Sequence, residues 1–195
     1  MMPFVPWKPA ARLDDASLAR RLVAGDRVAL AAVYEREAAA VYRYALGVCG
    51  NAAWAADATQ DAFIALASRP ATFDAARGTL GAWLAGIARH ALLAHWRGAK
   101  DLSPMEDVDD DDDAVLSIDA LLVRKQDSDA LWAAIRALPW PFREALVLVD
   151  LQERPYEQAA QIAGIELNTL RSRLHRARAR LAAQLNGGRA TGEAA

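Results

Sequence analysis

The sequence has little of the chemistry on which secreted proteins and many enzymes depend. Among its 195 residues there are one cysteine, Cys49, and three histidines. A single thiol cannot close an intramolecular disulfide, which favours a reducing compartment. Cys49 lies in an apolar, helical context, so its interpretation as a small buried side chain is preferred over that of a reactive thiol.

Recognisable catalytic and metal-binding sets are also missing. His90 and His95 are five residues apart, so they do not share a helix face as a zinc-binding pair does. The aspartate run 109–113 lacks the spaced ligands and the glycine of a calcium loop. There is no Walker-type loop and no nucleophile elbow. We therefore expect no enzymatic activity, no cofactor and no metal site.

Long apolar runs are absent as well. No stretch approaches the roughly 18 apolar residues that a membrane helix requires, so no membrane span is expected. The start, MMPFVPWKPAARLDD, lacks the apolar segment of a signal peptide, and its three prolines predict a flexible arm over residues 1–12. These features together predict a cytoplasmic location.

The net charge of −2 conceals a strong asymmetry along the chain. Residues 101–119 hold nine acidic residues and no basic one. Residues 154–189 hold seven arginines and two acidic residues. The charge of each segment is therefore a better guide to its partners than the overall value.

Helical patterns fill the N-terminal half, residues 13–98. Apolar spacing and breaks predict helices over 13–25, 26–50, 52–68 and 80–97. In the last of these, Trp83 falls on the buried face, whereas Arg89 and Arg97 point the other way. Short connections between these segments indicate a compact helical bundle.

The pattern fails over residues 99–126, where dense negative charge opposes compaction and predicts a solvated linker. Helices are expected again over 127–138 and 142–151, with a sharp break at residues 139–141. A disordered tail is expected over 187–195. The chain is thus predicted to be all-α, with two small helical domains, 13–98 and 127–186, joined by an acidic tether.

Residues 155–185, PYEQAAQIAGIELNTLRSRLHRARARLAAQL, have the pattern of a helix-turn-helix. Gly164 ends the first helix, because glycine readily takes the left-handed conformation of a helix C-cap. Asn168 is a candidate N-cap for the second helix. The apolar face of that second helix has three- and four-residue spacing and consists of Leu170, Leu174, Ala177 and Leu181.

The rest of the second helix is basic. Five arginines and no acidic residue occur between Arg171 and Arg180. Arginine presents a planar fork that fits phosphate and the guanine edge in the major groove. An ordinary solvated helix more often alternates in sign to gain i,i+4 pairs, so this stretch favours DNA binding over that simpler interpretation.

The order of these features resembles the extracytoplasmic-function (ECF) type of bacterial RNA polymerase sigma factors. The resemblance spans about residues 18–185. Its N-terminal segments are RLVAGDRVALAAVYE, DATQDAFIAL and FDAARGTLGAWLAGIARHALLAHWR. Its C-terminal segments are LPWPFREALVLVDLQERPYEQAAQIAGI and LNTLRSRLHRARARL.

The resemblance implies a transcription initiation factor with a region 2-like bundle and a region 4-like helix-turn-helix domain. The implied partners are core RNA polymerase, through its β′ clamp helices and β subunit, and promoter DNA, with an anti-sigma factor as a further possible partner. The segment that matches the polymerase-binding part of the family contains Asp57, Gln60, Asp61 and Phe63. A simple polar helix face explains the spacing of the first three equally well, and Phe63 is also a core candidate.

The loop and helix over 73–97 resemble the part of the family that captures the melted −10 element. A flipped base needs stacking surface and hydrogen-bond donors. The residues to which this role is carried are Phe73, Arg77, Arg89, His90 and Arg97. His90 stands where the family often has asparagine, which leaves the base preference open.

The helix-turn-helix resembles the module that reads the −35 element. The positions implied for DNA binding are Asn168, Thr169, Arg171, Ser172, Arg173, His175 and Arg176. Arg173 has a second interpretation, that of holding the domain together. Glu166 replaces the proline common at the turn, and its charge near DNA is expected to weaken binding.

Other functional classes stay open at this point. A stand-alone helix-turn-helix regulator would need a dimer interface or an effector pocket, and neither is evident in the sequence. A degenerate sigma-like adaptor would bind polymerase without directing initiation. The acidic linker is either a nucleic-acid mimic in a basic polymerase channel or a solubilising tether.

Overall fold

The computed structural model describes residues 14–99 and 125–192, and it describes side chains within these ranges except at 98–99, 125–128 and 186–192. Every regular element in these ranges is helical, and no strand occurs in them. This confirms the all-α prediction. The predicted arm 1–12 and most of the predicted linker 99–126 lie outside the described residues.

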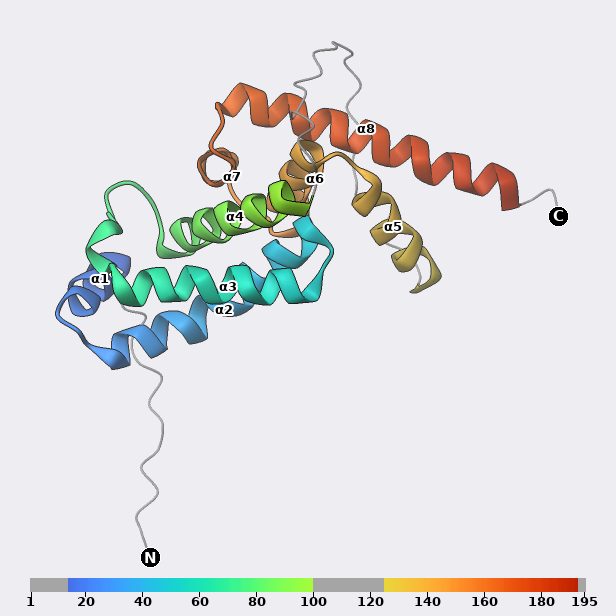
Figure 1. Cartoon of the computed structure of the whole chain (residues 1–195). Coiled ribbons are helices and arrows are strands. Elements are labelled where there is room, and N and C mark those ends of the chain that lie inside the picture. The colour runs from blue at the N-terminus through green and yellow to red at the C-terminus, as the bar shows by residue number, and fades with distance from the viewer. Residues whose placement is uncertain (1–13, 100–124, 193–195) are drawn as a thin grey trace, which may run out of the picture.

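The N-terminal half contains α1 to α4 and a short 3₁₀ turn, η1 (Figure 1). Their bounds are α1 Asp15–Val23, α2 Arg27–Cys49, α3 Ala52–Ser68, η1 Pro70–Thr72 and α4 Leu80–Ala99. A polar side chain caps each of the first three helices by accepting from backbone N–H groups. These caps are Asp14, Asp26 and Asn51.

The N-terminus of α4 is held from two directions. Asp15 Oδ2, on α1, accepts a hydrogen bond of 2.7 Å from the Leu80 N–H. Thr79 Oγ1 accepts one of 3.2 Å from the Ala82 N–H. Because a helix start has unpaired N–H groups, these bonds fix both the position of α4 and the end of the loop before it.

The C-terminal half follows with α5, α6, a π-helical segment η3, α7 and α8 (Figure 1). Their bounds are α5 Lys125–Ala137, α6 Trp140–Leu146, η3 Val147–Leu151, α7 Tyr156–Ala163 and α8 Leu167–Gly192. The predicted break at 139–141 is shorter than expected. Pro141 falls within the first turn of α6, where a proline costs no hydrogen bond. The helix α8 runs to Gly192, whereas the sequence predicted a disordered tail from Gly187.

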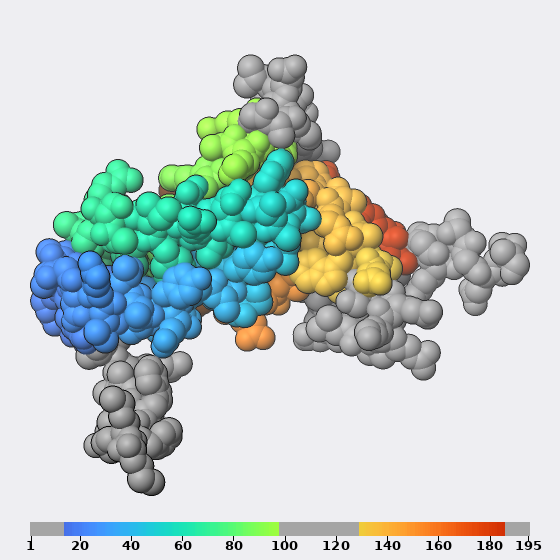
Figure 2. Space-filling view, turned by 60° about the horizontal axis from the view of Figure 1, so that its bottom comes forward, coloured from blue at the N-terminus to red at the C-terminus, as the bar shows by residue number. Residues whose placement is uncertain are grey.

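The buried residues of the two halves form one continuous cluster rather than two separate cores. Tyr44 and Leu84 from the first half and Ile135 and Leu148 from the second are almost wholly buried within it. Figure 2 shows α5 lying against α2, and α4 packs on α7. The sequence predicted two domains joined by a tether, and packing between them was not predicted.

Candidate nucleic-acid interface

The turn between α7 and α8 is set by one glycine. Gly164 has φ 66°, in the left-handed region, and its N–H bonds back to α7. The Ile165 N–H donates to the Ala160 carbonyl at 3.1 Å, which closes the turn. The C-cap predicted from the sequence is therefore confirmed, and it directs α8 across the end of α7.

The apolar face predicted for the second helix is also confirmed. Leu170, Leu174, Ala177 and Leu181 are each at most 2% exposed. Because this face is anchored in the core, the opposite faces of α8 are fixed in direction relative to α6 and α7.

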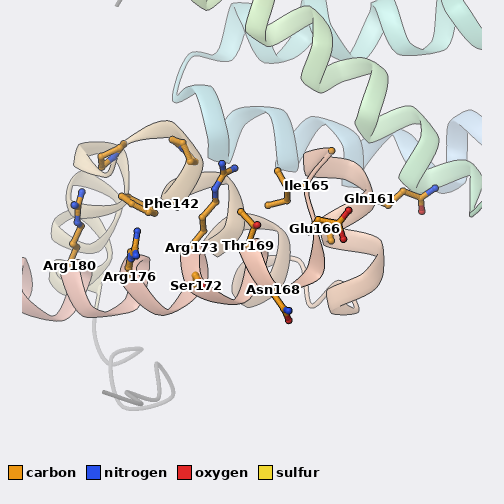
Figure 3. Close-up of a pocket in the computed structure, with 14 residues that line it drawn as sticks. Phe142, Gln161, Ile165, Glu166, Asn168, Thr169, Ser172, Arg173, Arg176 and Arg180 are labelled. Atoms are coloured by element: carbon orange, nitrogen blue, oxygen red, sulfur yellow. The ribbon is translucent and has the colours of Figure 1, made fainter. Parts of the chain in front are cut away.

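The predicted cap at Asn168 is wrong. The helix α8 begins at Leu167, and the Leu170 N–H donates to the Glu166 carbonyl. Asn168 therefore lies inside the first turn, where its Oδ1 accepts a 3.4 Å hydrogen bond from Arg171. Asn168 also lines the groove described next (Figure 3).

A groove of about 850 Å³ runs in front of α8, between the start of α6 and the end of α7. From α8 it is lined by Asn168, Thr169, Ser172, Arg173 and Arg176 (Figure 3). The structure thus brings five of the predicted DNA-contacting residues to one surface. Arg171 is exposed and His175 is half-buried, and neither lines this groove.

Two arginines of α8, Arg178 and Arg180, contact residues of other elements. Arg178 pairs with Asp150 of η3 through bonds of 2.6 and 3.1 Å, and hydrogen bonding to that carboxylate raises the pKa of Arg178. The guanidinium of Arg180 lies 4.5 Å from the centre of the Phe142 ring, a cation–π contact. The charge pattern alone could not predict these contacts.

A second pocket, of about 390 Å³, lies beside the loop before α4. It contains four of the five residues predicted to capture the −10 element, namely Phe73, Arg77, Arg89 and His90. Arg97 is exposed further along α4 and does not line this pocket. The far wall of the pocket comes from α7 and its C-cap, through Gln161, Ile162 and Gly164.

The aromatic residues at this pocket differ from the prediction. Phe73 is 7% exposed, with its ring edge-on to Trp83 at 6.0 Å between centroids. Trp83 was expected in the core, yet it is half-buried and lines the pocket.

The side chain of Arg89 differs most clearly from its predicted position. It was expected to point away from the buried face, but its side chain is only 12% exposed and its Nε donates to Glu144 Oε1 at 2.8 Å. Tyr44 OH donates to the same oxygen at 2.8 Å. Burial raises the pKa of the Glu144 carboxyl, although Arg89 and Tyr44 favour its charged form. Burial also raises the pKa of Tyr44.

The residues predicted to bind polymerase differ in exposure. Asp57, Gln60 and Asp61 are exposed on α3, so they form the expected polar patch. Phe63 is buried, with its ring 4.8 Å from that of Tyr34, as the alternative interpretation allowed.

An apolar groove of about 660 Å³ lies beside this patch, between α2 and α3. The large side chains of Tyr34 and Ile64 are about half exposed along it. These two residues were not predicted from the sequence as part of an interface. Their signal is weak, because each is an apolar residue that falls just outside a helical core face.

Sequence reasoning also missed Tyr44, Glu144 and Arg143. Arg143 donates to the Val48 carbonyl at 2.8 Å and to Leu138 in its own half. A glutamate within an apolar helix was the available signal for Glu144, since an acidic side chain is rarely buried without a partner.

Within the ranges 14–99 and 125–192, no cluster of three or more His, Cys, Asp or Glu residues could hold a metal ion. Over the same part of the chain, no helix is long and apolar enough to cross a membrane.

Comparison with known proteins identifies both halves. Residues 33–101 match the family model described as Sigma-70 region 2, and residues 128–181 match that of Sigma-70, region 4. The ECF RNA polymerase sigma factor SigM of Mycobacterium tuberculosis is 33% identical over 173 residues, which cover 87% of this chain and 83% of that protein.

Solved structures agree in fold. CnrH in complex with the cytosolic domain of CnrY is 21% identical, with a TM-score of 0.66, and the match covers 89% of this chain and 97% of CnrH. The sigma factor RpoE of Bartonella quintana, solved with the anti-sigma factor NepR, is 26% identical with a TM-score of 0.57. That match covers 76% of this chain and 91% of RpoE.

Proposed function

The chain belongs to the ECF RNA polymerase sigma factors, which direct RNA polymerase to promoters, and we propose that it does so through three separate surfaces. It is a transcription initiation factor, and its proposed mechanism is entirely non-covalent. It acts in the cytoplasm, where its polymerase is. The proposed domains are a region 2-like bundle over 13–98 and a region 4-like domain over 127–186, connected by the acidic linker 99–126.

The groove beside α8 is the proposed binding site for the −35 element. Arg173 and Arg176 line it together with Thr169 and Ser172, so charged and hydroxyl donors share one surface. Arginine discriminates guanine through two parallel hydrogen bonds in the major groove, and hydroxyl groups contact bases or phosphates. Arg171 is exposed beside the groove and is proposed to contact the DNA backbone. Asn168 lines the groove as well and is proposed to contact DNA there, whereas His175 does not line it and is proposed to have a supporting role.

The pocket beside the loop before α4 is the proposed −10 site. A flipped base needs an aromatic surface and donors around a small cavity, and Phe73, Trp83, Arg77 and His90 surround such a cavity here. Arg97 is exposed on the same helix and is proposed to contact phosphate in the adjoining duplex.

The polar patch of α3 is the proposed contact with the β′ clamp helices of core polymerase. Asp57, Gln60 and Asp61 are exposed there beside the apolar groove of Tyr34 and Ile64. A polar rim around an apolar strip is the usual anatomy of a protein interface. We also propose that an anti-sigma factor binds this chain, since the related RpoE of Bartonella quintana is bound to one.

The observation that carries this proposal is the convergence of Thr169, Ser172, Arg173 and Arg176 on one groove of a helix-turn-helix. The test is run-off transcription with purified core RNA polymerase on a pool of genomic fragments, with and without this protein. New discrete transcripts are expected, and their start sites would map both promoter elements. Absence of transcripts with retained polymerase binding would favour the adaptor, and loss of both would favour a stand-alone regulator.

A further inference from the structure

The groove between α2 and α3 is apolar and partly aromatic, and we call it the α2–α3 groove. Its volume is about 660 Å³, and Tyr34, Tyr42 and Phe63 are among the residues that line it. Tyr34 and Ile64 are 55% and 51% exposed, so large apolar side chains face water along it. Exposed apolar surface of this kind, gathered in one groove, is typical of a binding site.

The α2–α3 groove has two distinguishable ends. Only Gly50 and Asn51 connect α2 to α3, and the two helices run antiparallel (Figure 1). The residues from the start of α2 and the end of α3 therefore line one end, and those from the end of α2 and the start of α3 line the other. On α3 the groove runs from Ala56 to Ala67. At the rise of an α-helix this is a length of about 16 Å.

The edge of the groove along α3 is acidic. Asp57 and Asp61 are exposed, and each directly follows a residue that lines the groove, Ala56 or Gln60. The groove therefore suits a ligand that combines apolar or proline side chains with positive charge.

A segment with this chemistry precedes α1 in the same chain. Residues 1–13, MMPFVPWKPAARL, lie outside the described residues; they contain Lys8 and Arg12 and no acidic residue. Pro3, Pro6 and Pro9 follow one another at every third position. A polyproline II helix repeats every third residue, so the three rings would share one edge of such a helix. Proline-rich segments in this conformation bind aromatic-lined grooves at low cost in conformational entropy.

The segment is long enough to reach the groove. Asp15 forms an ion pair with Arg36, two residues after Tyr34, so the chain enters the bundle near the Tyr34 end of the groove. Residues 3–9 in polyproline II conformation would extend about 19 Å, close to the length of the groove. Residues 10–13 can span up to about 13 Å between this segment and α1.

We propose that residues 3–9 bind in the α2–α3 groove of their own chain as a polyproline II helix. The direction follows from the point of entry, with Pro9 near Tyr34 and Pro3 near Tyr42. The aromatic side chains pack against the prolines, and the basic residues of the segment lie toward the acidic edge of α3.

The bound segment has a consequence for polymerase. The groove borders the polar patch of α3 that is proposed to contact the β′ clamp helices, so the segment and polymerase compete for one surface. The apparent affinity for core polymerase is then lowered to the fraction of molecules whose groove is free. This competition rests on the proposed function of the patch, whereas binding of the segment in the groove does not.

The first test traps the bound segment in the full chain as a disulfide. In a Cys49→Ser background, Met2→Cys is combined with Ala56→Cys at the far end of the groove. The matched control combines Met2→Cys with Ala24→Cys, an exposed residue that does not line the groove and is nearer in sequence. A tether that does not bind would reach both positions. We expect the Ala56 pair to oxidise about tenfold faster than the Ala24 pair in one glutathione buffer, because binding raises the local thiol concentration.

Changes in the segment itself test the recognition without altering any described contact. Pro3→Ala, Pro6→Ala and Pro9→Ala together should lower the oxidation rate of the Ala56 pair to that of the Ala24 pair, because the polyproline II preference is lost.

Three results would overturn binding of the segment in the groove. The first is equal oxidation rates for the two cysteine pairs. The second is an Ala56 rate that does not respond to the three proline changes. The third is disulfide-linked dimers in place of the intramolecular disulfide, which would assign the groove to a second copy of the chain.

The second test addresses the competition. The protein with the three proline changes should bind purified core RNA polymerase several-fold more tightly than the wild type does. The form locked by the Met2–Ala56 disulfide should bind core polymerase more weakly than its reduced form. Equal binding of the locked and reduced forms would overturn the competition alone. Failure of the wild type and of every variant to bind core polymerase would instead overturn the proposed sigma-factor mechanism.

Discussion

At the scale of single residues, Glu144 connects protonation to stability. Its pKa is raised by burial above the ordinary value of 4.5, despite the pairing with Arg89 and Tyr44. The folded form therefore binds this proton more tightly than the unfolded chain does. The stability contributed by the protonated group is fully present below pH 4.5 and is lost as the pH rises through the raised pKa.

We expect Glu144→Gln to remove this pH dependence, because the amide mimics the protonated carboxyl and does not titrate. The free energy of unfolding of both proteins should be measured by urea titration from pH 4.5 upward. The wild-type protein should lose stability relative to the variant as the pH rises. A constant difference across this range would contradict a raised pKa at Glu144, since other groups titrate equally in both proteins.

Asp150 and Arg178 form a partly buried pair within the C-terminal half, with side chains 11% and 27% exposed. Asp150→Asn should reduce the free energy of unfolding by about 1–3 kcal/mol, because Arg178 loses two charge-assisted hydrogen bonds. Urea denaturation measures this change. Asp61→Asn, the same change at an exposed position, should shift stability by less than about 0.5 kcal/mol.

At the scale of elements, α8 presents its groove-lining residues as one surface. Arg176→Ala should weaken initiation at −35-dependent promoters by about 1–3 kcal/mol, the usual contribution of one bidentate base contact. Run-off transcription measures this loss, and co-elution with core polymerase should be unaffected. Gln184→Ala, at an exposed position of the same helix, is the control. Equal loss of polymerase binding in Arg176→Ala would contradict the assignment.

Glu166 lies at the entrance to the same groove, just before α8 begins. Its carboxylate repels DNA phosphate, so Glu166→Gln should strengthen binding to the mapped −35 duplex several-fold. The gain should shrink as salt rises, since screening weakens the repulsion. Fluorescence anisotropy at two salt concentrations measures both effects. A gain that does not depend on salt would point to a change in the turn itself.

The sequence predicted elements well where local signals act alone. Gly164 ends α7, the predicted helices 26–50 and 52–68 are present, and the apolar face of α8 is buried, because each depends on neighbours within a few residues. The Asn168 cap was wrong because α8 begins one residue earlier, at Leu167, and local signals place a helix end only to within a residue or two.

At the scale of the whole molecule, the sequence could not predict how the halves meet. Tyr44 and Glu144 are 100 positions apart, and no local pattern links a tyrosine on α2 with a glutamate on α6. For the same reason Arg89 was assigned to an open surface, although its partner comes from the other half. The candidate residues at the −10 pocket could be named from the resemblance, but the wall formed by α7 could not.

The two halves are connected both by their packing and by the linker. Cutting the linker separates the effects of these two connections. An engineered protease site that replaces residues 109–113 would divide the chain without changing any described contact. We expect the cut halves to co-elute in gel filtration, because the contacts between them remain. Glu144 still accepts from Tyr44 and Arg89, and Arg143 and Gln152 still donate to backbone carbonyls of α2. Promoter-directed transcription should nevertheless fall more than about tenfold. In the cut protein no tether keeps the two halves at a high effective concentration near each other when they bind polymerase and DNA separately. Halves that separate on cutting would contradict the stable packing of the two halves on each other, and cut protein with full activity would show that the tether is dispensable.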